Sequence, residues 1–179
     1  MILYRHAPPG FPFLWETTQQ PAGRWHDLGE GPVHYLADTP DGAWAEFLRH
    51  EEINTVEELA GIQRAVWAID VPDDDVRAAA QPQVADDVLI GGVRSYSTCR
   101  GEARRLRAGG VQGLGAPSAA LVGGGAHGWR VDGGLRPGSA RDGRVIVLFG
   151  ARPDLLGWQV VDEGRPGPEL LERVRPLAP

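Results

Sequence analysis

One glutamate in the first half of the chain lies where a carboxylate could take part in catalysis. Residues 40–50 predict a helix, on which Glu46 neighbours Phe47 and lies at the edge of the apolar face. Most glutamates on helices are ordinary exposed residues, and that interpretation stays open for Glu46 taken alone. A partly buried carboxylate, however, can stabilise a cationic, oxocarbenium-like centre, as in glycosyl transfer. Glu46 is therefore a candidate catalytic residue.

Two arginines are candidates for binding an anion. Each stands beside an aromatic residue, in Tyr4-Arg5 and in Arg24-Trp25, so its guanidinium could be held by stacking while its fork meets an anion. A surface salt bridge is the alternative for both. All 18 basic residues are arginines, so Schiff-base chemistry on a lysine is excluded. Every cationic contact must come from an arginine, whose planar guanidinium group suits phosphate.

A serine is the third candidate. Ser118, in the sequence APSAA, has no G-x-S-x-G context, so a serine-hydrolase nucleophile is not expected. A hydrogen-bonding serine at a strand end and a plain loop serine both stay open.

The single Cys99 excludes an intrachain disulfide and a C-x-x-C metal site, and the five histidines form no H-E-x-x-H motif. We therefore expect neither a metal nor, without lysine, a phosphate-binding P-loop.

The composition excludes several function classes. The 179 residues suit one domain, and their net charge of −6 and pI near 5.3 argue against a nucleic-acid-binding surface. The N-terminal residues lack the pattern of a signal peptide, and no apolar run approaches the roughly 18 residues needed to cross a bilayer. We expect a cytoplasmic protein that binds neither nucleic acid nor membrane.

The elements that would position the candidate residues are short and mixed. Alternating and apolar runs predict strands, while capping residues and helical periods predict helices. The strands are expected at 1–6, 33–37, 65–71, 144–149 and 158–161, and the helices at 40–50, 56–62, 96–108 and 168–174. The run RVIVLF at 144–149 is expected to be a central strand covered on both faces. This mixture predicts an α+β fold.

Three segments have no clear regular pattern. Residues 72–95 show no firm period, and 111–121 predict a strand that emerges into a loop. The Gly-rich residues 122–143 predict either an ordered flap at the active site or a mobile loop. We expect this segment to close over the cleft, where Arg130 could reach an anion.

The order of these blocks resembles a known family. The blocks are Tyr4-Arg5, Gly23-Arg24-Trp25, VHYLA at 33–37, Ala45-Glu46 in a helix ending LRH, and Pro117-Ser118-Ala119, and they are similar to successive parts of the RES domain. The similarity is strongest over residues 3–120, within a single RES-like domain of residues 1–179 whose last part, 144–179, carries C-terminal strands and a helix. The resemblance implies a split, twisted β-sheet flanked by short helices, like the fold of ADP-ribosylating toxins.

The resemblance also implies an activity. Members of the RES family are best known as toxins of bacterial toxin–antitoxin pairs, with an antitoxin of the Xre helix-turn-helix type. Characterised members deplete NAD⁺ by hydrolysis or phosphorolysis, and at least one ADP-ribosylates a protein. The implied function is an NAD⁺ glycohydrolase or phosphorylase, with a mono-ADP-ribosyltransferase and a non-catalytic binding module as alternatives. NAD⁺ would be the substrate, and an Xre-type antitoxin or a second copy in a homo-oligomer the protein partner.

Site roles follow from the matching positions. As the resemblance implies, the phosphates of NAD⁺ would be held by Arg5 and Arg24, with Tyr4 as a stacking residue. Tyr35 would line the nicotinamide–ribose pocket, in which Ser118 would hydrogen-bond. Glu46 would bind the ribose hydroxyls and stabilise the oxocarbenium ion as nicotinamide leaves.

The sequence departs from the family pattern in two places. His26 stands where the family often has Asn. The family's Asn-Pro-x-His stretch after the serine corresponds here to GGGAHGWRVDGG, in which His127 is the only histidine. The acceptor of the ADP-ribosyl group, which is water, phosphate or a protein side chain, stays open.

Overall fold

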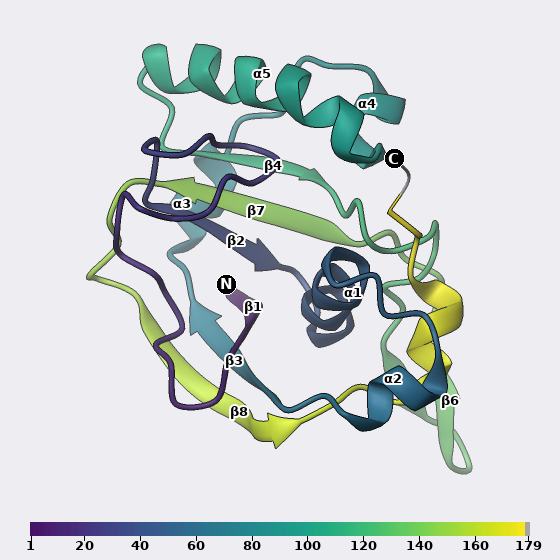
Figure 1. The fold of residues 1–179 in the computed structure, drawn as a ribbon. Coiled ribbons are helices and arrows are strands. Elements are labelled where there is room, and N and C mark those ends of the chain that lie inside the picture. Colours follow the sequence, from purple (N-terminus) through teal and green to yellow (C-terminus); the bar gives the residue numbers. More distant parts are fainter. Residues whose placement is uncertain (178–179) are drawn as a thin grey trace.

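The protein folds around a six-stranded antiparallel sheet (Figure 1). The computed structural model describes residues 1–177. The strands lie in the order β4-β7-β2-β1-β3-β8. Their bounds are β1 (Ile2–Ala7), β2 (Val33–Ala37), β3 (Arg64–Asp70), β4 (Gly113–Pro117), β7 (Arg144–Phe149) and β8 (Leu156–Gly164).

The sheet is split between β1 and β2. β1 pairs with β3 along its whole length, and β2 pairs with β7 along its whole length. Across the junction between β1 and β2, by contrast, only Tyr4 and Ala37 are paired. The halves β4-β7-β2 and β1-β3-β8 are therefore joined at one residue pair and diverge elsewhere. This confirms the split sheet that the resemblance implies.

Helix α1 (Pro40–His50) forms where the sequence predicted it. The side-chain oxygen of Thr39 accepts a hydrogen bond of 2.9 Å from the backbone N–H of Gly42, and Pro40 occupies the first turn. The helix buries Ala45 and Leu48 in a cluster that also holds Val66 of β3. Because α1 is fixed at both its cap and its apolar face, the side chain of Glu46 has a defined position.

Strand β7 is covered on both faces, as the RVIVLF run predicted. Val145, Val147 and Phe149 pack in a cluster with helices α4 (Asp86–Ile90) and α5 (Tyr96–Ala108). The alternate residues Ile146 and Leu148 pack in a second cluster with residues of β1 and β3. Figure 1 shows α4 and α5 beside β4, at the far end of the sheet from β8.

The structure also corrects the expected elements at several points. Residues 72–95 contain short helices: α3 (Asp73–Ala78), α4 and the 3-10 helix η1 (Val93–Ser95). The second predicted helix is shorter, α2 (Val56–Ala60), and the terminal one is a 3-10 helix, η2 (Pro168–Arg173). The Gly-rich segment forms a hairpin of β5 (Trp129–Val131) and β6 (Leu135–Pro137). Within residues 1–177 no helix is both long and apolar enough to cross a membrane.

Candidate active site

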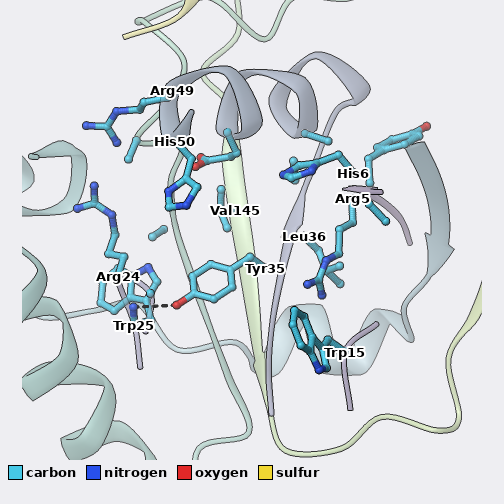
Figure 2. Close-up of a pocket in the computed structure, with 18 of the residues that line it drawn as sticks. Arg5, His6, Trp15, Arg24, Trp25, Tyr35, Leu36, Arg49, His50 and Val145 are labelled. Carbon is cyan, nitrogen blue, oxygen red and sulfur yellow. Dashed lines mark hydrogen bonds between the residues drawn. The ribbon is translucent and has the colours of Figure 1, made fainter. Parts of the chain in front are cut away.

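A cavity of about 640 Å³ opens at the split between β1 and β2 (Figure 2). Residues 4–7 of β1 and 35–37 of β2 line it, and α1 contributes Glu46. Tyr35 and Leu36 are successive residues of β2 whose side chains point to opposite faces of the sheet, yet both line the cavity. The cavity therefore extends through the split from one face toward the other. Its volume is that of a small-molecule site.

Glu46 lines this cavity and contacts Ser118, from which 72 residues separate it. Ser118 itself does not line the cavity and lies just behind its wall, between the lining residues Pro117 and Ala119. The Ser118 hydroxyl donates a hydrogen bond of 3.2 Å to Oε1 of Glu46. The same Oγ accepts bonds of 3.2 Å from the N–H groups of Ala120 and Leu121, which leaves its proton for the carboxylate. Ser118 is thus a hydrogen-bonding serine at the end of β4, not a plain loop serine.

Burial raises the pKa of Glu46 above its ordinary value of 4.5. The positive charges of Arg49 and Arg24 and the hydrogen bond from Ser118 oppose that rise, because they favour the ionised carboxylate. Glu46 is therefore a desolvated carboxylate whose negative charge is stabilised by two arginines and one hydrogen bond. Such a group can stabilise a cation that forms beside it.

Arg5 lines the same cavity from strand β1. Its Nη1 is shielded from solvent and has no hydrogen-bond partner among the described residues. Burial lowers the pKa of this guanidinium to about 10, so it stays charged at neutral pH. A buried cation with an unsatisfied donor is costly unless an anion binds it. Arg5 thus fits the predicted contact with a phosphate group.

Arg24 also lines the cavity, but its terminal nitrogens bind the protein itself. Nη2 donates to the carbonyl of Gly91 at 2.6 Å, and Nη1 donates to the carbonyl of Val88 and the hydroxyl of Ser95. Its guanidinium lies 4.8 Å from the centre of the Tyr96 ring. Arg24 therefore fastens the segment around α4 to the cavity wall, a contact that the sequence did not indicate.

Sequence reasoning missed Arg49. Its Nη2 donates to the carbonyls of Ile90 and Gly91, while its Nε is buried and finds no partner within residues 1–177. It lines the cavity three residues after Glu46 on the same helix, and that spacing was the signal that could have identified it. Arg64 and His6 line the cavity as well, with Arg64 Nη2 3.0 Å from His6 Nδ1.

Tyr35 lines the cavity between Arg5 on one side and Arg24 and Arg49 on the other (Figure 2). Its hydroxyl accepts a hydrogen bond of 2.9 Å from the N–H of Trp25 and lies 2.9 Å from Nδ1 of His26. His26, which departs from the family pattern, thus takes part in fixing Tyr35. Gly23 is required by the same contact, because a Cβ at this position would lie 2.6 Å from the Tyr35 hydroxyl oxygen.

The substitution Gly23→Ala is expected to destabilise the protein by about 1–3 kcal/mol, the usual cost of overpacking. At this chain length that corresponds to a fall in Tm of roughly 3–10 °C. Thermal unfolding of Gly23→Ala should be compared with Gly101→Ala, since a Cβ at Gly101 in α5 meets nothing within 4 Å. Tyr35→Phe should recover part of the loss in the double variant, and equal unfolding temperatures for both glycine variants would contradict the close contact.

The remaining predicted residues divide into two groups. Tyr4 lines the cavity and packs against the cluster around α1. Arg130 does not line the cavity; it lies 3.5 Å from Asp132 within the β5–β6 hairpin. His127 also lies outside, with its ring against Trp129. The expectation that residues 122–143 close over the cleft is therefore wrong, because hairpin pairing holds this segment elsewhere.

The structure brings the candidate residues together in a defined class of site. A split antiparallel sheet encloses a cavity that, among the described residues, is lined by four arginines and one partly buried carboxylate. These features define an α+β domain with a cationic pocket. Among the residues that the structure describes, no group of His, Cys, Asp or Glu side chains is placed to hold a metal ion.

Comparison with known proteins gives the family. The sequence matches the RES domain over residues 2–168, so the chain belongs to the RES domain family. No curated protein matches the chain. Its structure is similar to a chain in the crystal structure of the M. tuberculosis MbcT–MbcA toxin–antitoxin complex, with a TM-score of 0.58 and 18% sequence identity. The match covers 96% of this chain and 86% of that chain, and it confirms the fold.

Proposed function

We propose that this protein cleaves the bond between nicotinamide and ribose in NAD⁺ and acts as the toxin of a bacterial toxin–antitoxin pair. The observation that carries the proposal is Glu46, which lines the cavity and is held by Ser118 from behind its wall. The same cavity contains Arg5, whose Nη1 has no partner among the described residues. Membership of the RES family supports the same activity.

The chemistry needs few groups. Cleavage of this N-glycosidic bond expels neutral nicotinamide from a pyridinium that is already positively charged, so no strong general acid is required. Positive charge then develops on the ribose, as in other glycosyl transfers. A preorganised carboxylate stabilises that charge more in the transition state than in the ground state. Glu46 suits this task because Ser118 fixes one of its oxygens.

The arginines of the cavity are suited to bind the diphosphate of NAD⁺. Arg5 and Arg49 lie on opposite sides of Tyr35 (Figure 2), and each has a buried N–H without a partner in the part of the chain that the structure describes. Guanidinium groups bind phosphate oxygens with charge-assisted hydrogen bonds. With the nicotinamide ribose beside Glu46, the diphosphate would reach Arg5 through the split. The fixed Arg24 would then act mainly by shaping the wall and by its charge.

Product analysis tests the proposal and identifies the acceptor. Purified protein is incubated with NAD⁺, with and without inorganic phosphate, and nicotinamide release and product masses are followed. Free ADP-ribose identifies a glycohydrolase, and phosphate-dependent ADP-ribose-1″-phosphate identifies a phosphorylase. Label on added protein identifies a mono-ADP-ribosyltransferase. Absence of turnover, with Glu46→Gln indistinguishable from wild type, would leave a binding module and overturn the proposal.

The toxin role is tested in cells. The similar solved structure is a complex of a toxin with its antitoxin, which supports an antitoxin partner for this chain. Induced expression should arrest growth and lower cellular NAD⁺, whereas Glu46→Gln should do neither. A helix-turn-helix protein encoded beside the gene should restore growth. Unchanged growth and NAD⁺ at high expression of folded protein would contradict the toxin role.

The substitution Ser118→Ala is expected to lower NAD⁺ cleavage at pH 7 about 10-fold, because it removes a hydrogen bond to a charged group. Loss of this donor raises the pKa of Glu46 further, since the bond favours the ionised form. The acidic limb of the pH–rate profile should therefore move to higher pH. The exposed Ser139→Ala is the matched control. A uniform loss of rate at every pH would contradict the coupling of Ser118 to Glu46.

A further inference from the structure

An exposed tryptophan lines the end of the cavity where Arg5 lies. The Trp15 side chain belongs to the loop between β1 and β2, and Figure 2 shows it next to Arg5, on the side of Tyr35 opposite to Arg49. It is 54% exposed although it lines the cavity. Because the indole is exposed at the wall of a cavity, its flat face is available to a ring that enters there.

The backbone on both sides of Trp15 is held firmly. The buried Gln20 donates from Nε2 to the carbonyl of Trp15 at 2.5 Å and accepts at Oε1 from the N–H of Val33 at 2.8 Å. On the other side, the Glu16 carboxylate accepts bonds of 3.0 and 3.1 Å from the N–H of Arg152. The loop is therefore fastened to β2 and to the segment after β7. A fixed backbone that presents an exposed ring is a preorganised binding surface, since little further entropy is lost when a ligand stacks on it.

The order of groups along the cavity indicates what would stack there. This step rests on the proposed function: the ribose to be cleaved lies beside Glu46, and a phosphate reaches Arg5. The part of the substrate beyond that phosphate then lies against Trp15. In a dinucleotide this part is a purine nucleoside, whose flat π-face suits an indole.

We propose that Trp15 stacks on the purine base of the substrate and makes the site selective for a dinucleotide over a mononucleotide. Glu46 recognises the half of the substrate that reacts, and Trp15 recognises the half that does not. Binding energy gained at the remote half is available to orient the reacting half. A substrate without the purine nucleotide would still be cleaved, but it would not depend on Trp15.

The experiment compares two substrates and one ligand. NAD⁺ and nicotinamide mononucleotide share the scissile bond, and only NAD⁺ carries the purine. Trp15→Ala is expected to lower kcat/KM for NAD⁺ about 10-fold or more, the size of one base–aromatic stacking contact. It should change kcat/KM for nicotinamide mononucleotide less than about twofold. AMP binding, measured by calorimetry, should weaken in parallel with NAD⁺, and Trp15→Phe should retain most of it.

The matched control is Trp158→Ala. Trp158 lies on β8, is 53% exposed and does not line the cavity, so its loss should change none of the three measurements. An equal fall for both substrates in Trp15→Ala, or no fall for either, would overturn the proposal. AMP binding separates this proposal from the proposed function. If the wild type cleaves neither substrate, weaker AMP binding by Trp15→Ala still supports a stacking role, and equal AMP binding refutes it.

Discussion

The substitution Glu46→Gln is expected to lower the rate of NAD⁺ cleavage by about 10²–10³-fold, the usual loss when one preorganised electrostatic group is removed. Gln keeps the shape of Glu and an oxygen that accepts from Ser118, so the cavity should stay intact. Only the negative charge opposite the developing cation is lost. Single-turnover rates with the enzyme in excess over NAD⁺ measure this step, and in steady-state assays KM should change far less than kcat.

The same substitution should make the folded protein more stable at neutral pH. Burial raises the pKa of Glu46, so the folded state binds this proton more tightly than the unfolded chain does. The contribution of Glu46 to stability is therefore full below the ordinary value of 4.5 and is lost as the pH rises through the raised pKa. Glu46→Gln removes that loss. We expect a gain on the order of 1 kcal/mol at pH 7, or about 3 °C in Tm, and no gain at pH 4.

Urea unfolding at pH 4 and pH 7 measures the difference. The exposed Glu57, on α2, provides the control, because Glu57→Gln should show neither effect. A Glu46→Gln protein that cleaves NAD⁺ at the wild-type rate would remove Glu46 from the mechanism. A gain in stability of the same size at both pH values would show that packing, not the charge, causes it.

The sequence could predict Glu46 and Ser118 as site residues, but it could not predict the hydrogen bond between them. Glu46 was placed by helical periodicity, and Ser118 by its position at the end of a predicted strand. Their hydrogen bond depends on two further features: the N–H groups of Ala120 and Leu121, and the backbone bond of 2.8 Å from Ser118 to Gly143. These contacts arise from the pairing of distant segments, and no local pattern encodes them.

Arg24 and Arg49 show the opposite limit. The sequence identifies both residues as cations, and Arg24 was predicted to bind a phosphate. In the structure both guanidinium groups donate hydrogen bonds to the carbonyl of Gly91. This carbonyl follows helix α4, in the one long segment where the sequence showed no firm period. Because the acceptor could not be placed, the structural use of the two guanidinium groups could not be predicted. Arg5 was predicted on the same grounds, and here the structure leaves the cation free among the described residues.

The β5–β6 hairpin was misjudged because glycine content was taken as a sign of motion. Gly133 and Gly134 adopt φ values of 61° and 139°, which a turn between short strands requires. The glycines therefore serve the turn, and the hairpin keeps Arg130 beside Asp132. High glycine content allows both interpretations, and only the pairing of the flanking residues distinguishes them.

The substitution Arg5→Met is expected to weaken NAD⁺ binding about 10- to 100-fold, because charge-assisted hydrogen bonds to phosphate contribute roughly 1.5–3 kcal/mol. The loss should appear in KM and in calorimetric binding of ADP-ribose, while kcat at saturating NAD⁺ falls less. Met has a long flexible side chain that can fill the same channel, so the split sheet should not collapse. Arg130→Met is the control, since Arg130 does not line the cavity.

Without a ligand, Arg5→Met should stabilise the folded protein, although it weakens the binding of NAD⁺. Arg5 is partly buried, and its Nη1 has no partner within residues 1–177. Burial lowers its pKa to about 10, so its charge costs stability at every pH below that value. Arg5→Met should therefore raise the free energy of unfolding by a similar amount at pH 5 and at pH 8, unlike Glu46→Gln. Added NAD⁺ or ADP-ribose should raise the Tm of the wild type and reverse the order of the two proteins. Lower stability of ligand-free Arg5→Met, together with unchanged ADP-ribose binding, would mean that Arg5 supports the sheet and does not bind the substrate.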